Sequence, residues 1–493
     1  MPPSLTQESA CSHSKIIYTP SPHATQIGHA QPTLKQRQDA MHAAAPLSKS
    51  RLRLRPDQLI TDVDIFPAPL VLPGDDLALD PEYPPQSFRE WVDEEERNAV
   101  TARRRTVYVV SPPGVDSGMD GLGVEGWACP RDIDSALMAP FPETSDVVDY
   151  LSAFYHGLPV KHLDIPNWKF TSWDDPETQS TKRASKGKSK TSQLKKAQPQ
   201  SIGLATSTEC IRIRTRPCPD SVYSQQLNLD DLLDAAISIL PKDAYALCML
   251  VHHDLFEDED DTFVCGRAYG GSRVAVVSTA RYNPVLDAVQ GVQRDHSWPA
   301  AHCAAYIEDM CHAAGPASKR KKGNSKIQPQ SSQQHDKDGN QPLEAALAAY
   351  KGPRSSSNNS TSTIVPQSTT ALWLWRIART VSHELGHCFG IDHCVYYACI
   401  MQGSASLSED TRQPPYLCPV DLAKVLAATG ASVEERDRAL LRFCEREEWR
   451  GEPSFRAYAA WLKCSLRLGS SSDGDRKEKK ECKQAGYRTP TVY

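Results

Sequence analysis

The chain has 493 residues, 24% of them charged, and its formal net charge is −5. That balance argues against a protein that binds nucleic acid over its whole surface. A mean hydropathy of −0.50 and 37 prolines favour one moderate hydrophobic core with long disordered segments, and argue against several tightly packed domains.

The N-terminal part of the chain is polar. Residues 1–85 are rich in Ser, Pro, His and Gln, and we expect them to form a disordered leader. No apolar stretch is typical of a signal peptide or long enough to cross a bilayer, so we expect no membrane partner. The expected location is the cytoplasm, with the nucleus as a second candidate. In that reducing compartment, the 15 cysteines are expected to be free thiols or metal ligands.

A folded domain is predicted over residues 86–470, where strands and helices alternate. It is expected to begin with a charged helix near its N-terminal end. The β-branched segment TVYVV at 106–110 predicts a buried strand, and YALCMLV at 245–251 predicts another. Apolar residues at helical spacing predict amphipathic helices over 145–157 and 227–241. Two further strands are expected on either side of the turn YGGS.

Two low-complexity insertions interrupt this domain, at about 177–203 and 283–363. The first is strongly basic, but such segments are usually solvated, so nucleic acid is not an expected partner. The second contains a short predicted helix around 300–314. A long helix over 371–390 and two later helices follow, and the tail at 471–493 is expected to be loose. The expected fold class is therefore α/β (α+β) with a helical C-terminal part.

The long predicted helix carries a metal-binding pattern. His383 and His387 lie four residues apart, so both imidazoles occupy one helix face and can chelate one ion. Glu384 can take a proton from water at a zinc ion. Gly390 permits the positive φ that ends the helix in a sharp turn, and this turn returns His393 as a third ligand. Three neutral ligands leave a coordination position open, as a catalytic zinc requires.

The segment HELGHCFGIDH, followed by Met401, resembles the metzincin zinc-peptidase signature. In that family the methionine lies in a turn beneath the metal and does not bind it. The following cysteines, with Cys394-VYYA-Cys399-Ile-Met401, resemble the archaemetzincins. The resemblance implies a metzincin-like zinc-peptidase domain with a mixed, twisted sheet and an active-site helix. It also implies that AVVSTARYNP at 275–284 is a strand along the cleft, where an edge strand could pair with an extended peptide.

The same resemblance implies a second, structural zinc ion. Its ligands would be Cys394, Cys399 and Cys418, but Asp421 stands where the family has the final cysteine of C-x-x-C. Aspartate binds zinc through oxygen, so a site with three sulfurs and one oxygen is feasible, and a weakened or lost site is the alternative. A closed ligand shell would stiffen the loop that carries His393.

Other candidate residues favour ordinary structural roles. Cys388 is expected to be a small buried residue. His252 and His253 follow a predicted strand, and adjacent side chains on a strand point to opposite faces. We therefore expect the start of a polar loop there and no metal site.

The expected function is zinc-dependent hydrolysis of peptide bonds in a peptide or protein substrate. Glu384 would activate water and later protonate the leaving amine. The resemblance implies short peptides and aminopeptidase activity, while the residues themselves do not choose between exo- and endo-cleavage. The alternative is a non-catalytic interaction module of the same fold in which the metals only stabilise the structure. The intact Glu384 argues against that alternative, because a structural site needs no base.

Overall fold

The computed structural model describes most of the chain. The described residues are 11, 13–42, 54–55, 58, 65–134, 138–173, 200–313, 341–351 and 366–484. Most of the first predicted insertion and the last nine residues of the predicted tail therefore lie outside the described residues. None of the helices within these ranges is both long and apolar enough to cross a membrane.

A five-stranded mixed sheet lies at the centre of the fold, with strand order β10-β11-β8-β1-β3. Three of its four pairings are parallel, and β10 pairs with β11 in the antiparallel direction. The five strands are β1 (Thr106–Val110), β3 (Val160–His162), β8 (Ala244–Val251), β10 (Gly266–Tyr269) and β11 (Val274–Ser278). All eight residues of β8 are buried, because both faces of this sheet are covered.

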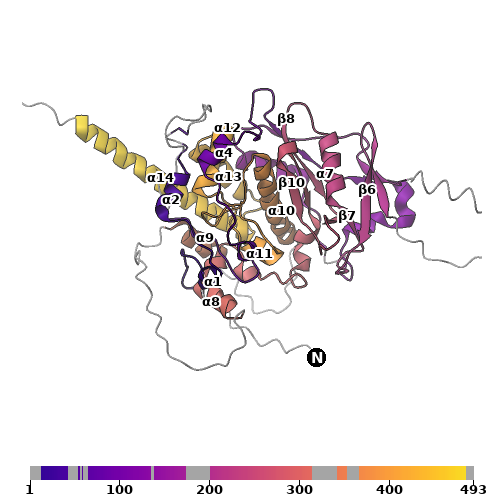
Figure 1. Ribbon diagram of the computed structural model, residues 1–493, viewed down its shortest axis with the longest axis horizontal. Coiled ribbons are helices and arrows are strands. Elements are labelled where there is room, and N and C mark those ends of the chain that lie inside the picture. Colours follow the sequence, from indigo (N-terminus) through magenta and orange to yellow (C-terminus); the bar gives the residue numbers. More distant parts are fainter. Residues whose placement is uncertain are drawn as a thin grey trace, which may run out of the picture.

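The two faces of the sheet bury alternate residues of β8, as the strand period of two requires. Ala246, Cys248 and Leu250 belong to the core shared with α10 (Pro366–Cys388) and α5 (Thr144–Phe154). Leu247, Met249 and Val251 belong to the core shared with α7 (Leu229–Ser238). Figure 1 shows α10 in the middle of the molecule, with β8 and β10 between it and α7.

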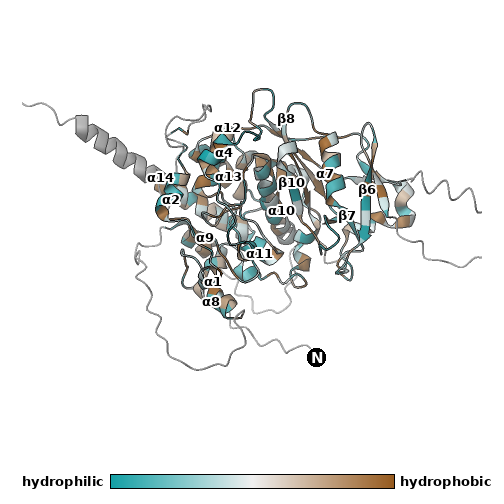
Figure 2. Ribbon diagram, in the orientation of Figure 1, coloured by the Kyte–Doolittle hydropathy of each residue, from teal (hydrophilic) through white to brown (hydrophobic). Residues whose placement is uncertain are grey.

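A second, six-stranded sheet lies beyond α7, with order β2-β4-β5-β6-β7-β9. Its strands are β2 (Gly114–Val115), β4 (Lys169–Thr171), β5 (Ser201–Ala205), β6 (Cys210–Pro217), β7 (Gln225–Asn228) and β9 (Asp254–Phe256). Asn228 caps α7, since its side chain accepts a hydrogen bond from the Asp231 N–H. The ribbon of α7 carries both hydrophilic and hydrophobic colours (Figure 2), as expected for a helix with one solvent-facing side.

Helices make up the C-terminal part, so the expected fold class is confirmed. They are α11 (Leu407–Arg412), α12 (Pro419–Thr429), α13 (Val433–Cys444) and α14 (Pro453–Gln484). Ser432 and Glu435 form the predicted capping box of α13. The prediction of a loose tail from residue 471 is wrong as far as Gln484, because α14 continues to that residue and projects from the body (Figure 1).

The prediction of a disordered leader over 1–85 is wrong for the residues that the structure describes there. They include α1 (Pro22–Gln26), α2 (Leu34–Ala40) and α3 (Asp76–Leu79), ahead of α4 (Phe88–Asp93). Phe66 packs edge-on against Tyr416, with ring centroids 5.4 Å apart. Such long-range packing leaves no local periodicity in the sequence, so composition alone suggested disorder.

The second predicted insertion, 283–363, is also partly folded. Its described residues include α8 (Ala304–Ala313) and α9 (Pro342–Lys351), and α9 packs along α14. The charged helix predicted before β1 is shorter than expected, because α4 ends at Asp93. A run of acidic residues follows Asp93, and like charges one turn apart destabilise a helix.

Candidate active site

The helix α10 and the turn after it bring the three predicted histidines together. The helix ends at Cys388, and Gly390 adopts a positive φ of 75° that reverses the chain. One ligand nitrogen from each of His383, His387 and His393 lies within 4.8 Å of the other two. The three imidazole rings therefore converge in the structure, as the sequence predicted.

Backbone carbonyls set the tautomers of two of these rings. Nδ1 of His383 lies 2.7 Å from the Ile400 carbonyl oxygen, and Nδ1 of His387 lies 2.7 Å from the Ile391 carbonyl oxygen. A carbonyl only accepts, so each Nδ1 carries the hydrogen and each Nε2 keeps a lone pair. Burial, followed by the neighbouring rings, lowers the pKa of both imidazoles, to about 4 for His387. Both rings are therefore neutral at pH 7.

The two lone pairs point at each other across a short gap. The Nε2 atoms of His383 and His387 are 3.0 Å apart, and neither has a hydrogen to donate to the other. Two facing acceptors repel unless a cation lies between them. Ligand nitrogens of a tetrahedral zinc site lie about 3.3 Å apart, given zinc–nitrogen bonds of about 2.0–2.1 Å. The donor set therefore fits a zinc ion.

Met401 lies directly beneath the histidine helix, as the metzincin resemblance implies. A Cβ on Gly386 would meet the Met401 sulfur at 2.5 Å, so only glycine permits this close approach. Met401 is fully buried, and its carbonyl accepts the Cys394 N–H at 2.8 Å. The turn thus supports the rings from below without providing a ligand.

Glu384 and the histidines line a cavity of about 1030 Å³. Burial raises the pKa of Glu384 to about 8, although the positive charge of Arg267 acts in the opposite direction. Arg267 belongs to β10, which also lines the cavity. A carboxyl group with a raised pKa beside imidazole ligands is suited to accepting and returning a proton near neutral pH.

The edge strand of the cleft is β10, and not the segment 275–284 that the sequence predicted. The strand β11 covers the start of that segment, but it pairs with β10 on one side and β8 on the other. β10 is the last strand in the sheet order and lines the cavity. β10 (GRAY) is short and contains Arg267, so its pattern marks a strand less clearly than that of β11 (VAVVS), which has the β-branched residues typical of one.

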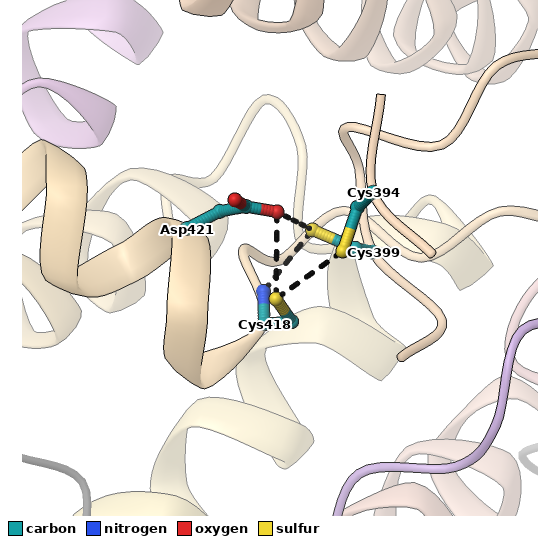
Figure 3. A group of neighbouring side chains, drawn as sticks. All are labelled: Cys394, Cys399, Cys418 and Asp421. Atoms are coloured by element: carbon teal, nitrogen blue, oxygen red, sulfur yellow. Dashed lines mark hydrogen bonds between the residues drawn. The ribbon is translucent and has the colours of Figure 1, made fainter. Parts of the chain in front are cut away.

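A second cluster joins the three predicted cysteines to Asp421. Cys418 is the N-cap of α12 and Asp421 lies in its first turn, while Cys394 and Cys399 come from the loop after His393 (Figure 3). The sulfurs of Cys394 and Cys418 are 3.5 Å apart. Oδ2 of Asp421 lies 3.3 Å from the Cys399 sulfur and 3.4 Å from the Cys418 sulfur.

These four groups are sealed from solvent. Cys394 is 4% exposed, Asp421 is 1% exposed, and Cys399 and Cys418 are fully buried. The sulfurs are free thiols, and two backbone N–H groups, of Met401 and Cys418, donate to the Cys399 sulfur at 3.5 and 3.2 Å. Such N–H donors and the positive end of α12 favour a thiolate, whereas burial acts more strongly and raises the pKa of the Cys399 and Cys418 thiols. Three sulfurs and one oxygen at these separations fit a closed, tetrahedral zinc site.

Lys424 places a buried positive charge next to Asp421, which the sequence analysis did not predict. Its Nζ lies 2.8 Å from Oδ1 of Asp421, and the lysine is 1% exposed. Burial raises the pKa of Asp421 to about 7, and the Cys394 sulfur acts in the same direction, while Lys424 opposes them. Oδ1 is thus held by lysine, and Oδ2 is left facing the sulfurs. The i, i+3 spacing on α12 could have suggested this pair.

An acidic group near the histidines was also missed, because it lies in the presumed leader. The Asp76 carboxylate and Nδ1 of His393 both lie within 2.9 Å of the position that a Cβ on Gly403 would take. Glu409 accepts the Asp76 N–H at 2.9 Å. His252 and His253 belong to no metal-ligand cluster within the described part of the chain. The prediction that a polar loop starts there is wrong, because His253 is buried and the buried strand β9 begins at Asp254. Cys388 is buried, as predicted.

Parts of the chain are similar in sequence to known proteins. Residues 364–425 match Peptidase family M54. Archaemetzincin-2 of Homo sapiens is 46% identical over 83 residues, which cover 17% of this chain and 23% of that protein. Archaemetzincin-1 of Homo sapiens is 26% identical over 250 residues, 50% of this chain and 40% of that protein. The chain is also similar to the crystal structure of archaemetzincin from Methanopyrus kandleri, at 15% sequence identity and a TM-score of 0.29. The superposition covers 67% of this chain and 99% of the archaemetzincin chain.

The helix with H-E-x-x-H, the glycine turn and the returning third histidine define a metzincin-type site. The segment 364–425 matches Peptidase family M54, and the predicted resemblance to the archaemetzincins is confirmed. The matched stretch spans only 23% of the archaemetzincin-2 protein, so the activity of this chain is inferred below from its own residues.

Proposed function

We propose that the chain is a zinc-dependent metallopeptidase that hydrolyses peptide bonds. The observation that carries this proposal is the pair of Nε2 lone pairs facing each other beside a buried Glu384 in a large cavity. His383, His387 and His393 would hold the ion. Bound zinc supplies Lewis acidity, which polarises a peptide carbonyl and makes water more acidic.

Glu384 is proposed to move the proton. Its carboxylate takes a proton from the attacking water and returns it to the nitrogen of the leaving amine. Burial raises the pKa of the Glu384 carboxyl group, and a cation among the histidines would lower that pKa towards neutral pH. The Ile400 and Ile391 carbonyls hold the two rings in the tautomer that the ligand role requires.

The edge strand β10 is proposed to bind the substrate backbone. Gly266, Arg267 and Ala268 line the cavity, and an extended peptide could add to the end of the sheet beside them. The substrate class is therefore a peptide or an exposed protein segment.

We further propose that the enzyme is an aminopeptidase. Asp76 provides a carboxylate next to His393, where it could bind the free amino group of a substrate. The comparison of free with N-acetylated peptides of one sequence tests this point. Faster cleavage of the free peptide, with single residues released, is the expected result, and equal rates would overturn the exopeptidase assignment.

The cysteine cluster is proposed to hold a second, structural zinc ion. Its four buried donors leave no space for substrate, and the loop between Cys394 and Cys399 connects His393 to Met401. A closed site there would stiffen the part of the catalytic site that lies outside α10.

The decisive experiment compares full-length wild type with Glu384→Gln on a peptide library, with zinc content measured in parallel. We expect turnover to fall by about 10²–10⁴-fold while zinc content stays unchanged. Glu209→Gln, which alters an exposed glutamate in the β5–β6 hairpin, is the matched control and should keep full turnover. Undiminished turnover in Glu384→Gln would refute the mechanism. A wild type that cleaves nothing but unfolds on chelation would favour the non-catalytic module.

A further inference from the structure

A third group of metal-ligand side chains lies apart from both sites described above. Ligand atoms of Cys11, His13 and His296 all lie within 4.8 Å of one another. The first two precede α1, and His296 ends the 3-10 turn Arg294–His296, ahead of α8. A fourth donor is close, because the Cys303 sulfur lies 3.4 Å from the Cys11 sulfur.

Backbone pairing holds these two distant segments side by side. Ile16 forms an antiparallel bridge with Cys303, and the Ile17 N–H donates to the His302 carbonyl at 2.9 Å. The Ala304 N–H donates to the Lys15 carbonyl at 2.9 Å. The donors from the N-terminal segment are therefore positioned by a framework that does not depend on the metal-ligand side chains themselves.

The ring of His13 is oriented as a metal ligand would be. It hydrogen-bonds to the backbone of Asp295, while its Nε2 is buried and has no hydrogen-bond partner among the residues that the structure describes. The hydrogen bond therefore comes from Nδ1, which leaves a lone pair on Nε2. The same arrangement is seen at His383 and His387. His13 also adopts a positive φ of 46°, an uncommon conformation that needs support from its surroundings.

The other imidazole is held by aromatic stacking. The ring of His296 stacks on Tyr306, with centroids 4.0 Å apart and planes 10° from parallel. It meets the His13 ring edge-on at 5.2 Å. Both rings of the group are thus fixed before any ion binds, which lowers the entropic cost of binding one.

We propose that Cys11, His13, His296 and Cys303 bind a zinc ion that fastens the N-terminal segment to the region before α8. Two sulfurs and two imidazole nitrogens are the donor set of many structural zinc sites. Cys303 lies outside the compact group of three, so its sulfur closes the shell by a small movement. The site is distinct from the proposed peptidase centre and does not depend on its activity.

The position of this site gives it a structural consequence. His302, next to Cys303, has its Nε2 3.2 Å from the Ala68 carbonyl. The segment after Ala68 continues to α3, whose first residue, Asp76, lines the large cavity. The ion would therefore stabilise the N-terminal segment that forms one wall of that cavity.

Elemental analysis of the full-length protein tests the proposal. The probe is zinc alone, and the variant is His13→Asn, because asparagine tolerates a positive φ but is a poor zinc ligand. We expect one zinc ion fewer per chain than in wild type. His42→Asn, an exposed histidine elsewhere in the N-terminal part, is the matched control and should lose none. An unchanged zinc content in His13→Asn would overturn the proposal.

Thiol labelling gives a second, local readout. Iodoacetamide labelling mapped by mass spectrometry should show the partly exposed Cys11 protected at least tenfold by zinc, with Cys129, which is exposed, labelled equally in both conditions. A Cys11–Cys303 disulfide in protein purified under reducing conditions, or labelling that zinc does not change, would count against the site. Glu384→Gln should retain this protection, so a failed peptidase mechanism would not be mistaken for a missing third ion.

Discussion

The histidine cluster and the cysteine cluster are adjacent in the chain but differ in access to solvent. His393 and Cys394 are consecutive, yet the histidines line a cavity of about 1030 Å³, while the four groups of the cysteine cluster are at most 4% exposed. One cluster has neutral donors with a side open to the cavity, and the other has donors on every side. A single loop can therefore support one metal ion suited to chemistry and another suited only to holding structure.

Charge reinforces this difference between the clusters. The imidazoles are neutral, so a bound zinc would keep its positive charge for polarising substrate. The cysteines and Asp421 would together outweigh the charge of zinc when all are ionised, and Lys424 provides a buried positive charge beside them. Zinc bound by the histidines would act as an electrophile. Zinc bound by the cysteine cluster would have its charge neutralised and would only hold the loop in place.

The largest effect is expected from removing a zinc donor of the cysteine cluster. Cys399→Ser is expected to release the proposed structural zinc and to lower the free energy of unfolding by about 3–5 kcal/mol, because the remaining buried sulfur and oxygen donors lose the cation that they share. Denaturant titration with zinc analysis measures both quantities. Cys444→Ser, at a buried thiol of α13, is the control and should leave the zinc content unchanged. Equal effects of the two variants would mean that the cluster holds no ion.

Lys424→Met tests whether the buried positive charge of Lys424 strengthens zinc binding by the cysteine cluster. We expect zinc affinity of the cysteine cluster to fall by about 10–100-fold, as for other groups that contact metal ligands. Competition with a coloured chelator measures this change. Lys463→Met removes a half-exposed partner of Glu445 and should leave the affinity unaltered. An unchanged affinity in Lys424→Met would show that Asp421 needs no counter-charge.

His253 offers a smaller test, because it is a buried histidine without a metal-ligand cluster. Burial lowers its pKa to about 4, although its hydrogen bond to the Val124 carbonyl acts in the opposite direction. The unfolded chain, with a histidine pKa of about 6.5, therefore binds the proton more readily. The stability contribution is present above about pH 6.5 and is lost as pH falls towards 4.

His253→Gln should remove this dependence. The free energy of unfolding of wild type relative to the variant is expected to drop by about 1 kcal/mol between pH 7.5 and 5.5. Urea titrations at the two pH values, with a chelator present, measure it. His42→Gln alters an exposed histidine and should show no such drop. If His253→Gln kept the wild-type pH profile, the ring would bind its proton equally well in the folded and unfolded chain, and burial would not lower its pKa.

Local pattern was enough to predict β1, β8, α7 and α10, and to select His383, His387 and His393 as ligands. The cysteine cluster was found through the archaemetzincin resemblance, with Asp421 as a feasible substitute. The sequence did not reveal that β10 is the edge strand, nor that Asp76 joins the cavity wall. Those two facts depend on the order of strands in space and on packing between segments hundreds of residues apart.

The amino-acid sequence by itself set the identity of the donors and the spacing of those on one helix or turn. A helix repeat of 3.6 residues and a glycine that tolerates positive φ act over a few residues, so no distant contact is needed. Tertiary packing alone determined which lone pairs face each other, which cluster is sealed and which opens onto a cavity. Burial and hydrogen bonding to distant carbonyls are collective properties, and they exist only once the whole core has assembled.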